Sequence, residues 1–234
     1  MNVSEEDKKR ALGKVELMKE FVLYDFQYRE AIYKLMNNSS PQEYIYPLLA
    51  LIHQLIENQL KMSLIECTNN RKTLKELKVE NTHNLKTIVE REEFFIYYDE
   101  IEKISTIYNE YRKYVIYFYE ILGEDTFLNS RYPIERFENI ATVKNKIDYK
   151  ELYENWTKYS LLSYEIGLIR IAYSYSNTIF YLLEHGLEKE KIKEEMKGII
   201  IETCMGVEEM TKKVLEYLDL YIKRNKHIDY GYVC

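Results

Sequence analysis

Three ionisable side chains follow one stripe of the apolar segment PLLALIHQLIENQLKMSLIEC, residues 47–67. His53, Glu57 and Lys61 are spaced four residues apart, and on a helix this spacing places all three on one face. Gathered with other polar side chains at a groove, they could contact RNA or a nucleotide. The alternative is a solvated stripe, in which Glu57 and Lys61 form an exposed ion pair worth about 0.2–0.5 kcal/mol.

His83 is the best candidate for a catalytic or ligand-binding imidazole. Thr82 precedes it and is a good N-cap, so the sequence predicts a short helix from His83 to about Glu90. The electropositive end of that helix would disfavour the protonated ring and leave a neutral imidazole that offers hydrogen bonds. The alternative is a structural role, in which His83 ties this connection to the helix of residues 47–67.

Residues 124–147 form a long stretch without helical periodicity and are predicted to be a loop. Loops of this length in compact domains are usually functional or disordered. Arg131 and Tyr132 combine a forked donor with a stacking face, a composition suited to a phosphate or nucleotide. The alternative is a clamp, in which Arg131 pairs with a carboxylate such as Glu57 and holds the loop.

Arg170 is the last candidate, and it interrupts an apolar helix predicted over residues 150–185. A buried guanidinium must be paired or must face a cavity. We therefore expect Arg170 either to form an ion pair with Glu165 or another carboxylate, or to contact a ligand.

Apolar residues recur at steps of three and four along most of the chain, which predicts helices. Only 7 Gly and 3 Pro among 234 residues indicate long helices with few turns. We expect one all-α domain over residues 1–234, a single bundle of about five long helices with a frayed tail at 228–234. The predicted helices span residues 4–36, 41–67, 83–90, 93–122, 150–185 and 188–224; Gly123 and Gly186 end two of them, and Gly198 and Gly206 allow a close crossing of the last.

The amino-acid composition limits which partners the protein can bind and in which cellular compartment we expect it. A net charge of −6 disfavours a general phosphate-binding surface. Cys67, Cys204 and Cys234, in a chain with no N-terminal apolar signal, indicate a reduced cytoplasmic setting. None of them has metal-ligand spacing, so no metal site and no cofactor is predicted. No window is long and apolar enough for a membrane span.

Three short motifs resemble the HEPN superfamily of helical bundles. They are Glu57-x-x-x-Lys61, His83-Asn84-Leu85 and Arg131-Tyr132-Pro133, and the resemblance covers roughly residues 45–135. It implies a component of a prokaryotic toxin or defence system, and many such proteins are metal-independent endoribonucleases that act as dimers. Their usual signature, an Arg followed four to six residues later by a His, has no counterpart here, since eleven residues separate Arg71 from His83 and two separate Arg224 from His227.

The three motifs, together with the missing Arg-to-His signature, favour a protein that binds its ligand over one that cleaves it. We expect a homodimeric protein of a prokaryotic or phage defence or toxin–antitoxin system that binds RNA or a nucleotide without cleaving it. One alternative is a ribonuclease in which His83 acts with Arg131 or Arg170. The other is a protein-binding regulator, an antitoxin or anti-defence partner, that uses surfaces rich in the 24 tyrosines.

Overall fold

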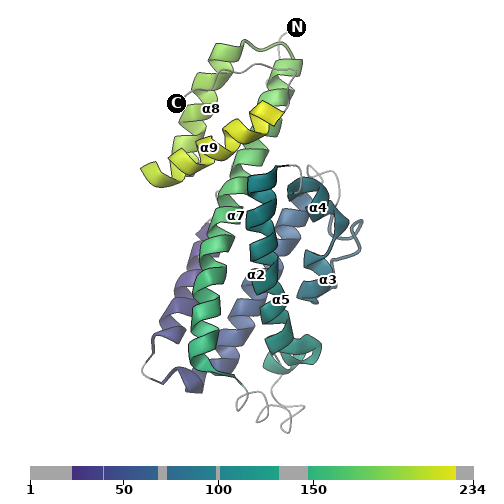
Figure 1. The fold of residues 1–234 in the computed structure, drawn as a ribbon, viewed down its shortest axis with the longest axis vertical. Helices are drawn as coiled ribbons and strands as arrows, with labels where there is room; N and C mark the ends of the chain where they lie inside the picture. Colours follow the sequence, from purple (N-terminus) through teal and green to yellow (C-terminus); the bar gives the residue numbers. More distant parts are fainter. Residues whose placement is uncertain (1–22, 39, 68–72, 99–100, 132–146, 225–234) are drawn as a thin grey trace. The chain divides into compact units, whose positions relative to one another are not determined.

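The computed structural model describes residues 23–38, 40–67, 73–98, 101–131 and 147–224, with the backbone alone described for residues 41–42, 96 and 122–131. These residues form a bundle of helices and contain no strand, which confirms the all-α prediction (Figure 1). None of the helices within these ranges has the length and apolarity needed to span a bilayer. In chain order they are a helix over residues 23–36, η1 (Pro41–Tyr44), α2 (Ile45–Cys67), α3 (Leu85–Val89), α4 (Glu92–Tyr98), α5 (Glu102–Arg131), α7 (Tyr149–Glu184), α8 (Lys189–Thr203) and α9 (Glu208–Arg224).

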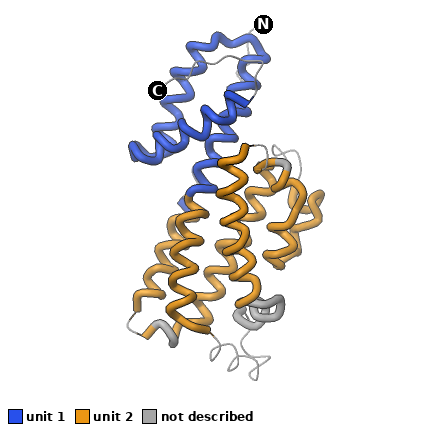
Figure 2. Tube along the Cα trace, in the orientation of Figure 1, with its two compact units in different colours: residues 1–23, 165–234 blue, residues 24–164 orange. Residues whose placement is uncertain are grey.

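The chain divides into two compact units (Figure 2). Residues 24–164 form one unit, and residues 165–224 belong to the other. Helix α7 runs through the boundary, so each unit holds part of it. A single domain over the whole chain stays a prediction.

Helix α2 is the centre of the first unit. Pro47 lies in its first turn, where a helix needs no backbone N–H donor, so the proline is tolerated there. The apolar rows of α2 are fully buried and pack against α3, α4 and α5. Its side chains that are at most 1% exposed are Ile45, Leu48, Leu49, Ile52, Leu55, Ile56, Leu60 and Leu64.

Aromatic rings join α5 to the first half of α7. Tyr159 lies 5.5 Å, centroid to centroid, from each of Tyr111, Phe118 and Trp156. Aromatic pairs of this kind contribute about 0.5–1.5 kcal/mol beyond their area burial. Part of the tyrosine excess is therefore core packing.

The predicted helix of residues 93–122 is wrong in two respects. It is divided into α4 and α5, because the rings of α4 pack back onto α5, with Tyr98 stacked 4.3 Å from Tyr108. It also continues through Gly123 to Arg131, so residues 124–131 are helical and were wrongly predicted as loop. An internal glycine costs a helix only about 1 kcal/mol, which a long helix tolerates. The rest of the predicted loop, residues 132–146, lies outside the described residues, as does the predicted tail at 228–234.

The second unit contains the end of α7, then α8 and α9. Gly186 has φ +81° and follows the end of α7, which confirms the predicted stop. The single helix predicted over residues 188–224 is wrong, because α8 ends at Thr203 and α9 begins at Glu208. Gly206 lies in the turn between them with φ +71°, a conformation that favours glycine, and not within a helix.

Candidate functional site

Glu57 is the centre of a polar cluster in the first unit. Its side chain is buried, and Lys61 Nζ donates a hydrogen bond to Glu57 Oε1 at 2.8 Å. His83 Nδ1 lies 3.1 Å from both carboxylate oxygens, and His53 Nδ1 lies 3.5 Å from Oε2. Glu57, Lys61, His83 and His53 therefore lie together, and we call these four residues the Glu57 cluster.

The same side chains hold the connection before α3 against α2. His53 Nε2 lies 3.0 Å from the backbone oxygen of His83, and Lys61 Nζ donates to the backbone oxygen of Glu80 at 3.1 Å. Each carbonyl is therefore bound by a side chain from a rigid helix. The structural alternative for His83, a tie between this connection and α2, is confirmed.

These contacts assign the protons of both rings. A carbonyl oxygen can only accept, so His53 carries a proton on Nε2. An ionised carboxylate also only accepts, so His83 carries a proton on Nδ1, where it faces Glu57. In the neutral ring of His83, Nε2 is then the acceptor nitrogen.

Burial opposes ionisation of Glu57, but the hydrogen bonds from Lys61 and His83 and their charges outweigh it, and the net effect is a lowered pKa of the Glu57 carboxyl. Glu57 is therefore ionised at neutral pH. The Lys61 side chain is 8% exposed, so a lost carboxylate would leave its charge buried. Removing one partner of a buried pair typically costs about 3–5 kcal/mol.

Solvent reaches one member of the cluster. The His83 side chain is 43% exposed, whereas Glu57 is 5% exposed. The predicted solvated stripe is therefore wrong, because the connection before α3 covers it. The expectation that Lys61 could contact a ligand phosphate is also wrong, since its ammonium group is buried and bound to Glu57 and Glu80.

The residues beside His83 differ from the prediction. Asn84, and not Thr82, is the N-cap of α3, and its Oδ1 accepts a hydrogen bond from Thr87 N at 2.9 Å. His83 thus precedes the helix and is not in its first turn. Asn84 Nδ2 also donates to the Tyr119 hydroxyl on α5 at 3.4 Å; the sequence analysis missed both residues.

The other predicted site residues are not part of this cluster as described. The side chain of Arg131 and all of Tyr132 lie outside the described residues. Arg170 is 8% exposed and belongs to the other unit. The partner suggested for it, Glu165, accepts hydrogen bonds from Lys213 Nζ at 2.8 Å and from the Tyr217 hydroxyl.

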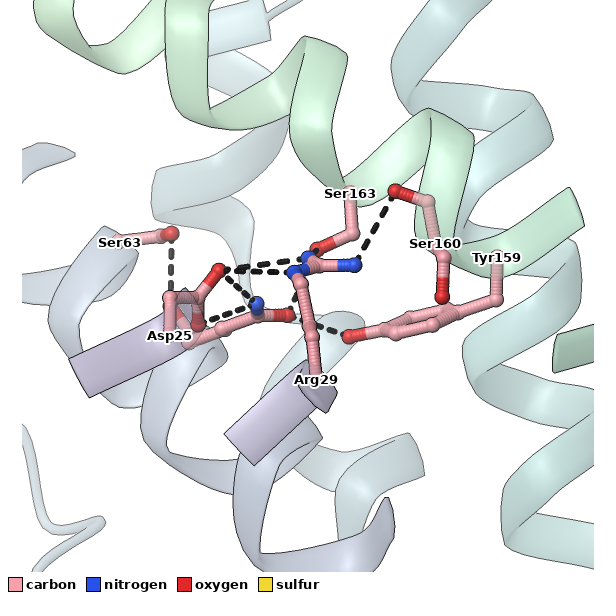
Figure 3. A network of polar contacts seen from close by, with 7 residues as sticks. Asp25, Arg29, Ser63, Tyr159, Ser160 and Ser163 are labelled. Atoms are coloured by element: carbon pink, nitrogen blue, oxygen red, sulfur yellow. Dashed lines mark hydrogen bonds and ion pairs between the residues drawn. The ribbon is translucent and has the colours of Figure 1, made fainter. Parts of the chain in front are cut away.

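A second polar network in the first unit was not predicted. Gln59 on α2 donates to both oxygens of Asp25 and accepts from the Tyr159 hydroxyl and, at 2.7 Å, from Ser163 Oγ (Figure 3). Arg29 donates to Asp25, to Ser163 Oγ at 2.6 Å and to the Ser160 carbonyl at 3.1 Å. The signal in the sequence was a glutamine within the apolar rows of α2. Periodicity alone does not say which helices bring its partners.

Within the described ranges, no group of three or more His, Cys, Asp or Glu side chains is placed to hold a metal ion. Comparison of the chain with protein-family models, curated proteins and solved structures finds no match.

Proposed function

We propose that this protein is a HEPN-like bundle, with about five main helices, of a prokaryotic or phage defence or toxin–antitoxin system. It acts in the cytoplasm and binds RNA or a nucleotide at the surface around His83, without cleaving it. The proposal rests on the three motifs in the sequence and on one observation in the structure. That observation is a half-exposed imidazole whose Nδ1 is held by a buried carboxylate.

The charges of the Glu57 cluster are compatible with an anion at His83. Lys61 neutralises Glu57, so the pair presents no net negative charge that would repel an anion at the exposed ring. A hydrogen bond between an imidazolium and a phosphate is charge-assisted and roughly twice as strong as a neutral one. Because Glu57 already fixes the ring, little side-chain entropy is lost on binding.

The surroundings favour a short ligand over a long nucleic acid. Asn84, which follows His83 in the chain, donates to the hydroxyl of Tyr119 on α5, and an amide together with an aromatic ring suits one base and one phosphate. Lys86 is exposed on α3, but Glu80 and Glu90 are exposed on the same segment. This balance limits the attraction for a phosphate backbone, in agreement with the net charge of −6.

The burial and ionisation of the Glu57 cluster favour binding without cleavage. Metal-independent cleavage needs a base and an acid that both reach the reacting atoms. Within the Glu57 cluster only His83 meets solvent; Glu57 is buried and ionised, and Lys61 is buried. A ribonuclease remains the second candidate, since a carboxylate on Nδ1 is also how a general base is oriented.

The test measures fluorescence anisotropy of a labelled oligoribonucleotide and a labelled nucleotide with wild type, His83→Ala and His83→Gln. Loss of one charge-assisted contact should weaken binding about tenfold or more. His185→Ala is the matched control, because His185 is an exposed histidine at the end of α7. Equal affinities for His83→Ala and His185→Ala would refute the site. Metal-free RNA cleavage that depends on His83 would establish the ribonuclease instead, and capture of a protein but no ligand would favour the regulator.

A further inference from the structure

His83 is an exposed imidazole that is held in one orientation. Its Nδ1 lies 3.1 Å from both carboxylate oxygens of Glu57, whose side chain is 5% exposed. Its own backbone oxygen lies 3.0 Å from His53 Nε2, so the main chain at this residue is also tied to α2. The side chain of His83 is nevertheless 43% exposed. The exposed part of the ring is therefore the side that points away from Glu57, and this side carries Nε2.

This orientation makes Nε2 a nucleophile. Because the proton of the neutral ring is on Nδ1, the available lone pair is on Nε2. When this lone pair attacks an electrophile, Nδ1 keeps its proton and the ring becomes positively charged. Glu57 is ionised at neutral pH and faces that proton. It therefore stabilises a charge that develops only as the new bond forms, and it acts as a positioning residue for His83.

The charges around the ring limit the choice of electrophile. Lys61 donates to Glu57, so the ion pair has no net charge that would repel an anionic phosphoryl donor. The ammonium group is buried, however, and cannot reach the leaving group of such a donor. ATP needs cations at its leaving phosphate, which the Glu57 cluster does not present. A phosphoramidate fits better, because its leaving group is an amine that departs uncharged.

We propose that His83 Nε2 accepts a phosphoryl group from a phosphoramidate-type donor, a class that includes the phosphorylated histidines of other proteins. A bond forms between Nε2 and phosphorus, and the P–N bond of the donor breaks. The electron pair of that bond stays on the donor nitrogen, which is protonated in the donor and leaves as a neutral amine. The phosphoryl group arrives with two negative charges, and the Nδ1 proton stays beside Glu57. This reaction does not depend on the ligand binding proposed above.

His185 offers a matched comparison within the same chain. It is also exposed, and its Nδ1 lies 2.7 Å from the backbone oxygen of Tyr181. A carbonyl only accepts, so His185 also carries its proton on Nδ1 and its lone pair on Nε2. The partner of Nδ1 is a neutral carbonyl here and an ionised carboxylate at His83. The ratio of their reactivities therefore measures what Glu57 contributes.

The test treats full-length wild type and Glu57→Gln with potassium phosphoramidate at about pH 8, above the ordinary titration range of histidine. Mass spectrometry measures the initial rate of phosphorylation at each histidine, and nitrogen-15 NMR identifies the modified nitrogen. In wild type, His83 should react on Nε2 at least about tenfold faster than His185. In Glu57→Gln this ratio should fall below about threefold, because the amide carries no charge.

Urea-unfolded wild type covers the case in which Glu57→Gln fails to fold, which circular dichroism detects. In urea nothing holds the ring, so His83 and His185 should react at nearly equal rates. Equal rates in folded wild type would overturn the proposal, and so would modification of His83 on Nδ1. A preference for His83 that persists in urea, or that is unchanged in folded Glu57→Gln, would overturn it as well. No RNA or nucleotide enters this test, so its outcome is separate from that of the anisotropy measurement.

Discussion

Replacing Glu57 by glutamine tests the physical role of the Glu57 cluster. Glu57→Gln keeps the shape of the side chain and removes its charge. Lys61 then keeps only neutral acceptors, the new amide oxygen and the Glu80 carbonyl, while its side chain stays 8% exposed. His83 loses the carboxylate that fixes its ring.

The expected loss of stability in Glu57→Gln follows from the burial of the Glu57–Lys61 ion pair. Breaking a buried ion pair costs about 3–5 kcal/mol, and the remaining neutral acceptors should keep the loss near the lower end, about 3 kcal/mol of unfolding free energy. Replacing both charges by groups of similar volume is often close to neutral. Glu57→Gln combined with Lys61→Met should therefore lose less than the two single changes together, with a coupling of about 2 kcal/mol.

The assay is urea unfolding followed by tryptophan fluorescence. Trp156 is the only tryptophan of the chain and lies in the same compact unit as Glu57, so its signal reports on that unit. The midpoint should fall with an unchanged m-value. Glu154→Gln, at an exposed position of α7, is the control and should stay within about 0.5 kcal/mol of wild type. A loss below about 1 kcal/mol for Glu57→Gln would refute the reasoning, because it would mean that the carboxylate does not compensate a buried charge.

Two further predictions concern pH and backbone conformation. The pKa of the Glu57 carboxyl is lowered on folding, so the stability that this carboxylate contributes is complete above its pKa in the unfolded chain, about 4.5, and is lost as pH falls below that value. The difference in unfolding free energy between wild type and Glu57→Gln should therefore be constant above about pH 5.5 and shrink in acid. A difference that stays constant down to about pH 3 would contradict this. Gly167→Ala places a methyl group in open space on α7 and should raise stability by about 0.5–1 kcal/mol, whereas Gly206→Ala forces alanine to φ +71° and should lower it by about 1–2 kcal/mol. Thermal unfolding of Gly167→Ala and Gly206→Ala measures the direction of each change in stability. Equal shifts of the two melting temperatures would show that backbone conformation does not decide these changes.

Much of the helical content could be predicted from periodicity and from proline and glycine positions. The rows of α2 repeat at three and four residues, Pro41 stands at the start of η1, which leads into α2, and Gly186 follows the end of α7. The breaks after Tyr98 and Thr203 were missed, since the apolar spacing continues on both sides of each turn. Gly206 could have indicated the second break. The break after Tyr98 depends on the packing of Tyr98 against Tyr108, which is a contact between two helices and is not visible in the spacing of residues.

The sequence by itself determined that His53, Glu57 and Lys61 share one face of α2, because a helix of 3.6 residues per turn leaves no other arrangement. Only the tertiary structure decided that this face is buried. The connection ending at His83 folds over it, and backbone carbonyls and an imidazole 26 residues away supply the partners that make burial of the charges tolerable. Spacing along a helix fixes which side chains are neighbours, but exposure depends on what covers them. That cover comes from a segment whose path is set by long-range packing.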